Sequence, residues 1–113
     1  MATGRLGYAS GGLTTTTLTN VYTVPTGYYA VFNISVTNTA STTASVRIAL
    51  SSSATSGGIN SGEYIEYGTT IVGNGVFERT GLVANAGMTV WIYTTGATGA
   101  VNATVYGIET STT

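Results

Sequence analysis

The chain has 113 residues, of which 42% are hydrophobic and only 6% are charged, and its formal net charge is −1. Three Arg and no Lys are too few for the basic patch that nucleic-acid binding needs, and the lack of Cys excludes disulfides and thiolate metal sites. We expect one folded domain with a polar surface of Thr, Ser, Asn and Gly, and near-neutral surfaces of this kind tend to associate.

Residues 1–12, MATGRLGYASGG, are predicted to form a flexible N-terminal arm. They are rich in Gly and contain two apolar anchors, Leu6 and Tyr8, so the arm either frays or lies across a neighbouring subunit. The arm has no apolar segment of signal-peptide length, and the sequence nowhere approaches the roughly 20 apolar residues of a membrane span. We therefore expect a protein that is made in the cytosol, with no encoded route of secretion and no membrane partner.

Residues 13–109 are predicted to form the folded domain, because apolar and polar residues alternate there with the period of two that half-buried β-strands show. In YAVFNISVTN (29–38), the even-numbered apolar residues are expected to share one face. Strands are predicted at residues 12–17, 19–24, 29–38, 44–50, 63–67, 76–83, 88–94 and 101–108.

Turn signals separate these strands. Pro25-Thr26-Gly27 predicts a tight turn, and Asn74-Gly75 predicts the turn of a hairpin. The Ser/Gly-rich segment 51–62 is the longest loop and is expected to be mobile, and residues 110–113 are expected to be a disordered tail. About eight short strands at this spacing predict an all-β fold, a single antiparallel β-sandwich that is jelly-roll-like as first choice and immunoglobulin-like as second.

The sequence contains few side chains that could act in catalysis. Without His, a Ser nucleophile lacks its usual base, and without Lys no Schiff base can form. Glu63, Glu66 and Glu78 could act in pairs as in a glycosidase, and Glu66 and Glu78 flank the predicted hairpin turn on strands expected to be adjacent. Ion pairing at the surface among Glu66, Glu78 and Arg79 is the simpler interpretation. We predict no enzyme, no cofactor and no metal site, because hard cations need clustered carboxylates.

Three aromatic residues, Tyr29, Trp91 and Tyr93, fall at or beside outward positions of the predicted strands. Exposed aromatic rings stack on sugars, and they also anchor protein interfaces. A third possibility is that they pack under a loop or cover the second face of a sheet, because an outward position can still be covered by a neighbour. The residues alone leave these three interpretations open.

Five short segments combine in one pattern. They are Tyr22-Thr23-Val24-Pro25, Val46-Arg47-Ile48-Ala49, Tyr64-Ile65-Glu66-Tyr67, Glu78-Arg79-Thr80-Gly81 and Val105-Tyr106-Gly107-Ile108-Glu109. The pattern covers about residues 20–109 and resembles small virion structural proteins of tailed bacteriophages, notably cyanophages and other marine phages. The resemblance implies a β-sandwich that works in many copies, and it implies no catalytic residues. Similar modules look like head-decoration, tail-associated and fibre proteins alike.

The resemblance, the low charge and the β pattern together lead us to expect a virion structural protein. The expected role is that of a capsid decoration (cement) protein that binds the outer shell as a homo-oligomer, with a trimer favoured on symmetry grounds. Its expected partners are further copies of itself and the major capsid protein or another virion protein, and its expected location is the virion, reached by lysis. Two alternatives stay open: a tail, baseplate or fibre component, and a carbohydrate-binding module that presents Trp91 and Tyr93 to a host glycan.

Overall fold

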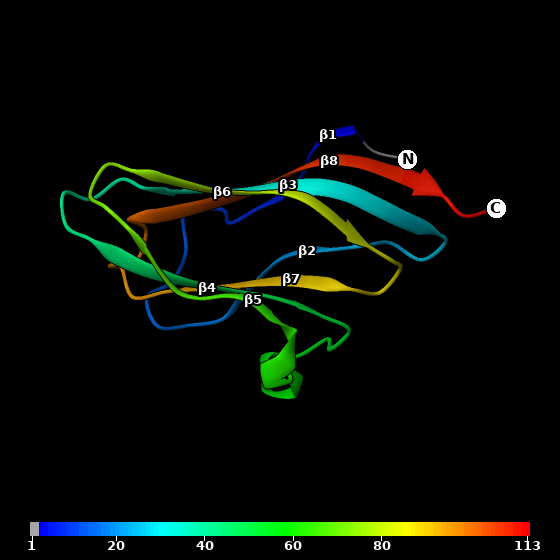
Figure 1. Cartoon of the computed structure of the whole chain (residues 1–113), viewed down its shortest axis with the longest axis horizontal. Helices are drawn as coiled ribbons and strands as arrows, with labels where there is room; N and C mark the ends of the chain where they lie inside the picture. Colours follow the sequence, from blue (N-terminus) through cyan, green and yellow to red (C-terminus); the bar gives the residue numbers. More distant parts are fainter. Residues whose placement is uncertain (1–2) are drawn as a thin grey trace.

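The structure is a computed structural model that describes residues 3–113, and these residues form eight β-strands (Figure 1). The strands are β1 (Thr3–Tyr8), β2 (Thr19–Thr23), β3 (Tyr28–Asn38), β4 (Ala44–Ser51), β5 (Tyr64–Ile71), β6 (Val76–Ala84), β7 (Thr89–Thr94) and β8 (Val101–Ser111). Two 3-10 turns, η1 (Ser56–Gly58) and η2 (Ser61–Glu63), lie in the connection between β4 and β5.

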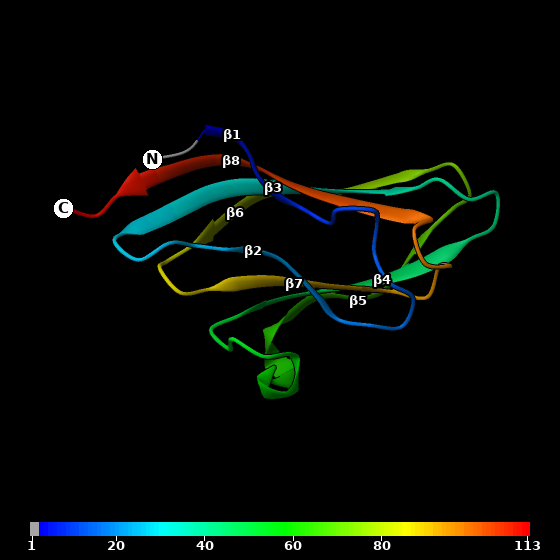
Figure 2. The ribbon, with the colours of Figure 1, turned by 180° about the vertical axis from the view of Figure 1, so that it is seen from behind.

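The strands form two four-stranded antiparallel sheets, which lie as two layers in Figures 1 and 2. The first sheet has the order β1-β8-β3-β6, and the second has the order β2-β7-β4-β5. The strand pairing is nested: β4 pairs with β5, β3 with β6, β2 with β7 and β1 with β8. The chain therefore has the pairing of one long hairpin whose two arms alternate between the two sheets. This is the order of an eight-stranded jelly roll, and the predicted sandwich is confirmed. The immunoglobulin-like alternative is wrong, because that fold pairs its first two strands in one sheet, whereas β1 and β2 lie in different sheets.

The core fills the space between the two sheets. As predicted for residues 29–38, the side chains of Ala30, Phe32, Ile34 and Val36 are buried. The same core cluster includes Val46, Ile48, Val90, Ile92, Val101 and Val105 from other strands. Because so few residues are charged, burial of these apolar side chains is the main source of stability.

One carboxylate lies inside the sandwich. Glu109 of β8 is buried, and its Oε2 accepts a hydrogen bond of 2.6 Å from the hydroxyl of Tyr22 in β2. Burial raises the pKa of Tyr22 above its usual value, and the hydrogen bond to Glu109 adds to this effect. The bond joins the first sheet to the second.

Both ends of the described part of the chain are more ordered than predicted. Residues 3–8 of the expected arm form β1, which pairs along β8, and residues 110–111 of the expected tail are part of β8. A Cβ atom on Gly7 would lie 2.3 Å from the carbonyl oxygen of Val21, so β1 also packs closely against the backbone of β2. The arm prediction counted apolar side chains, but β1 is held by backbone hydrogen bonds, which do not depend on them. Residues 1 and 2 of the expected arm lie outside the described residues.

The Thr-rich segment 12–17, predicted to be a strand, instead crosses from the first sheet to the second. The amide of Leu13 donates to the carbonyl oxygen of Val101 in β8, and the amide of Thr16 donates to that of Thr94 in β7, both at 2.8 Å. Thr16 has a φ of 50°, which is incompatible with a strand. Thr favours strands, but this preference depends on context, and here the fold requires a connection. The side chain of Leu13 is fully buried in the core.

The Asn74-Gly75 turn also connects the two sheets. Asn74 has a φ of 59°, and the amide of Gly75 donates to the carbonyl oxygen of Val72 at 2.9 Å, so the tight turn forms as predicted. The hairpin prediction is nevertheless wrong, because β5 pairs with β4 while β6 pairs with β3 in the other sheet. Turn chemistry determines the local backbone, whereas the partner of each strand depends on the whole sheet.

The buried side chain of Asn38, the last residue of β3, forms hydrogen bonds at the end of the sandwich where the chain changes sheets. Its Nδ2 donates to the carbonyl oxygens of Thr42 at 2.8 Å and Ile71 at 3.2 Å, with a longer contact of 3.4 Å to that of Val72. Its Oδ1 accepts from the amide of Ala40 at 3.1 Å. One buried side chain therefore ties the connection that follows β3 to the connection that follows β5.

Candidate interaction surfaces

The described residues offer open faces and no enclosed site. Residues 3–113 contain no detectable pocket, and they hold no group of three or more His, Cys, Asp or Glu that could bind a metal ion. Within that same range, no helix is long and apolar enough to cross a membrane. The side chains available for recognition gather on the outer faces of the two sheets.

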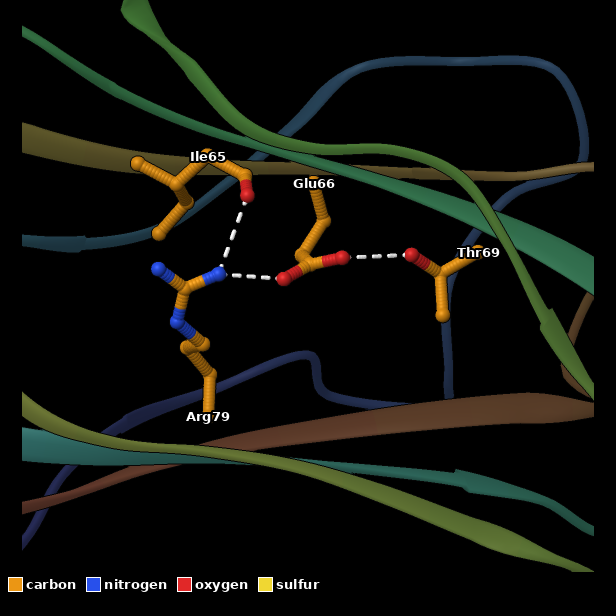
Figure 3. A network of polar contacts seen from close by, with 4 residues as sticks. All are labelled: Ile65, Glu66, Thr69 and Arg79. Carbon is orange, nitrogen blue, oxygen red and sulfur yellow. Dashed lines mark hydrogen bonds and ion pairs between the residues drawn. The ribbon is translucent and has the colours of Figure 1, made fainter.

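An ion pair closes one side of the sandwich (Figure 3). Arg79 of β6 donates to the carboxylate of Glu66 in β5, and its Nη1 also donates to the carbonyl oxygen of Ile65 at 3.0 Å. The hydroxyl of Thr69 donates to the other carboxylate oxygen of Glu66 at 2.5 Å. Because β5 and β6 lie at the same side of opposite sheets, the pair joins the two layers. Its role is structural.

Glu78 takes no part in that pair. It lies on the outer face of the first sheet, where it accepts a hydrogen bond of 2.7 Å from the hydroxyl of Tyr106 in β8. This hydrogen bond raises the pKa of Tyr106. The expectation that Glu66 and Glu78 lie on adjacent strands is wrong, because the chain changes sheets between them. The two carboxylates have separate partners and do not form the arrangement of a glycosidase.

Trp91 faces outward from β7 but is covered by the connection between β4 and β5. Only 6% of its surface is exposed, and its Nε1 donates to the carbonyl oxygen of Ser53 at 3.3 Å. Figure 1 shows this connection and its 3-10 turns on the outer side of the second sheet. Of the three interpretations of the aromatic residues, Trp91 follows the third, that of a ring packed under a loop.

Glu63 organises the loop that covers Trp91. Its Oε1 accepts hydrogen bonds from the amide of Asn60 at 2.8 Å and from the hydroxyl of Ser51 at 2.7 Å. The side chain of Asn60 in turn accepts from the amide of Gly62 at 2.9 Å, which completes a capping box around η2. The loop predicted to be mobile is therefore held by a network of hydrogen bonds. Glu63, which the sequence predicted only as a catalytic candidate, is its central acceptor.

This network predicts that acid uncovers Trp91. The hydrogen bonds from Asn60 and Ser51 hold the pKa of Glu63 below its usual value of 4.5. A lowered pKa means that the stabilising contribution is present above pH 4.5 and is lost as the pH falls through the lowered pKa. We expect the emission of Trp91, the single Trp, to shift to the red as the pH falls below 4.5, while the far-ultraviolet circular dichroism is retained.

The Ser51→Ala variant tests the cause of this shift. It removes a hydrogen bond that favours the charged carboxylate of Glu63, so the red shift should begin at a higher pH. Glu78→Gln is the control, because Glu78 lies on the other sheet and its removal should leave the transition unchanged. Emission that stays constant until the β-sandwich itself unfolds in acid, or a transition that Ser51→Ala does not move, would contradict the assigned role of Glu63.

Arg47 and two Tyr rings form a row across the second sheet. Arg47 in β4 pairs with Tyr67 in β5 and with Tyr93 in β7. Its guanidinium carbon lies 4.2 Å from the ring centre of Tyr67 and 4.6 Å from that of Tyr93. Tyr93 is thus in a cation–π row and not beside an exposed Trp ring. The alternation in 44–50 places Arg47 outward, but only the strand register brings it between the two rings.

Tyr29 lies on the opposite side of the molecule, on the outer face of the first sheet. The three aromatic residues therefore do not form one platform. Of the two proposed arm anchors, Leu6 packs against the core from β1. Tyr8 is exposed on the outer face of the first sheet, with the guanidinium carbon of Arg5 3.9 Å from its ring centre.

The exposed apolar residues concentrate on one surface. Among residues 3–113, eight large hydrophobic side chains are exposed, and six of them lie on the outer face of the first sheet. We call these six the apolar face: Tyr8, Tyr29, Val31, Val76, Val83 and Ile108. Single exposed apolar residues are ordinary, but a set gathered on one face marks an interaction site.

The apolar face is centred on β3 and β8. Val31 in β3 lies opposite Ile108 in β8 and opposite Val83 in β6, so the three form a row across the sheet. Their exposed fractions are 39%, 47% and 62%, and Tyr29 continues the face two residues from Val31. In this part of the face only Tyr29 was predicted as a candidate, because the neighbours of Val31 depend on the strand register.

Comparison of the chain with known proteins finds no matching family model, no matching curated protein and no matching solved structure. Eight-stranded jelly rolls occur in viral capsid domains and in lectin domains, among others. A fold shared by such different proteins does not by itself define a function. Any function must therefore come from the surfaces of the two sheets.

Proposed function

We propose that this chain is a non-enzymatic structural protein of a tailed-phage virion, a decoration protein that binds the outer capsid shell as a homo-oligomer. One observation carries the proposal: six exposed apolar side chains gather on the outer face of a single sheet. A protein that works in many copies needs such a face, because each contact must bury apolar surface to form. The resemblance of residues 20–109 to virion structural proteins supports the same role.

The low charge of the chain favours close packing of identical copies. With a net charge of −1, neighbouring copies have little electrostatic repulsion to overcome. Each contact contributes about 25 cal/mol per Å² of buried apolar surface, less the cost of ordering the partners. Repeated contacts across neighbouring capsomers would then stabilise the shell.

The row of Arg47, Tyr67 and Tyr93 provides a second surface, on the opposite side of the sandwich. Tyr and Arg are among the residues that contribute most to protein interfaces. In the proposed role, the apolar face contacts another copy, and this row is available to the major capsid protein. A jelly roll with two different contact faces can bind another copy of itself and the capsid shell at the same time.

The carbohydrate-binding alternative receives less support from the geometry. It depended on Trp91 and Tyr93 as a platform, but Trp91 is covered by the loop that contains Ser53. The tail, baseplate or fibre alternative uses the same surfaces at a lower copy number. Counting copies on the particle separates it from the decoration role.

The test is quantitative mass spectrometry of purified particles of the virus that encodes this chain, with the major capsid protein as internal standard. The decoration role predicts hundreds of copies for each particle. A few to a few tens of copies would replace it with the tail, baseplate or fibre role. Absence from the particle would overturn the virion proposal, and a glycan array with Tyr67→Ala as the matched variant would then test sugar binding.

A further inference from the structure

We infer that the apolar face binds the same face of a second copy, with a twofold axis that runs along the strands between β8 and β3. The inference rests on the proposed function, because it names the contact between copies that a homo-oligomeric decoration protein requires. The contact itself follows from the residues on this face and concerns the isolated chain.

The central row of the apolar face is complementary to itself about this axis. β8 and β3 are neighbours in the middle of the sheet, so a twofold axis between them places Ile108 of each copy against Val31 of the other. The same rotation places β1 of one copy against β6 of its partner. Thr3, which lies opposite Ile108 in its own sheet, then meets Val83. The apolar row is thus covered along its whole length.

The charges on this face are also complementary about the axis. Arg5 lies on β1, at one edge of the face, and Glu78 lies on β6, at the other edge. Within residues 3–113, neither side chain has an ion-pair partner of opposite charge. The twofold axis places β1 against β6 and sets Tyr8 of each copy opposite Glu78 of the other. Arg5 lies beside that position, because its guanidinium carbon is 3.9 Å from the ring centre of Tyr8. Two ion pairs form at the rim of the contact, where charges determine orientation and specificity.

The area of the face is adequate for a stable pair. β3 and β8 each contain 11 residues. β6 contains 9 residues and β1 contains 6, so the four strands have 37 residues in all. At about 3.4 Å per residue and about 4.8 Å between strands, they cover about 600 Å². Specific interfaces bury about 600 to 1,000 Å² on each partner, so the contact reaches the lower end of this range only when it uses the full face. Stacking of two such faces at about 10 Å is the ordinary packing of β-sandwiches.

This geometry requires a pair of copies and not the trimer expected from symmetry alone. A contact in which the same face serves both partners is isologous, and it is complete when two copies have met. A third copy would find the face already covered. The outer face of the second sheet remains open.

The decisive experiment is analytical ultracentrifugation of the isolated full-length chain over a range of concentrations. The expected species has twice the 11.5 kDa mass of one chain. Val31→Lys should weaken the pair by about thirtyfold or more, because it places a charge in the centre of the contact. Val72→Lys is the matched control, because Val72 is also an exposed Val but lies outside the apolar face, and it should have no effect.

A charge exchange tests the orientation and does not disturb the core. Arg5→Glu and Glu78→Arg should each weaken the pair by about tenfold, and the double variant should restore it, because the two charges meet only across copies. Circular dichroism confirms that each variant is folded. A monomer at all concentrations, a trimer, or a double variant as weak as the single ones would overturn the inference. Such a result is independent of the copy number on the particle, so the two proposals can fail separately.

Discussion

Replacement of Asn38 by Ala is expected to lower the free energy of unfolding by about 3 kcal/mol, a large part of the total for a small domain. The side chain is fully buried, and its Nδ2 donates to the carbonyl oxygens of Thr42, which follows β3, and of Ile71, the last residue of β5. Ala would leave those oxygens without their donor and would leave a small cavity. Because the bonds join two separate connections, their loss should loosen the end of the sandwich where the chain changes sheets.

Urea denaturation of the Asn38→Ala variant measures this effect. Asn33→Ala is the matched control, because Asn33 is on the same strand but faces outward and accepts one exposed bond of 3.0 Å from the amide of Gly81. It should cost about 1 kcal/mol or less. Asn38→Asp should destabilise at least as much as Ala at neutral pH, because a carboxylate would face carbonyl oxygens. Equal midpoints for the variants at positions 38 and 33 would refute the role given to Asn38.

Replacement of Leu13 by Ala is expected to cost about 3 kcal/mol, within the range found for fully buried Leu. Leu13 has no exposed surface, although it lies in a connection and not in a strand. Its amide donates to Val101 and its carbonyl oxygen accepts from the amide of Gly99 at 3.0 Å, so the backbone is held in place and cannot collapse into the cavity. The loss should therefore approach the full cost of an unfilled space.

The control for this variant comes from the same Thr-rich segment. Leu18→Ala changes a Leu that is only partly buried, and it should cost roughly 1 kcal/mol or less. Thermal unfolding followed by circular dichroism should show a clearly lower midpoint for the Leu13 variant than for the Leu18 variant. Similar midpoints would mean that Leu13 does not act as part of the core.

The candidate surfaces were only partly predictable. Tyr29, Trp91 and Tyr93 were correctly placed on outward positions, since alternation determines which face of a strand a residue occupies. Alternation does not determine whether a face is covered, and a loop covers Trp91. It also does not determine which outward residues become neighbours, and for this reason Val31 was not recognised as the centre of an apolar row. The neighbours of a side chain in a sheet depend on the strand register, which involves residues far apart in the sequence.

By itself, the sequence determined the class of fold, the positions of seven strands and the inward face of β3. These are local properties, because the alternation of side chains and the conformations of Gly, Pro and Asn act within a few residues. Contacts between distant segments are what make residues 3–8 a strand, keep the Thr-rich segment out of a strand and make the Asn74-Gly75 turn join two sheets. Each of these outcomes depends on which backbone groups find a partner across the sheet. The chain must satisfy its buried hydrogen bonds as a whole, and that requirement can override what a short segment prefers by itself.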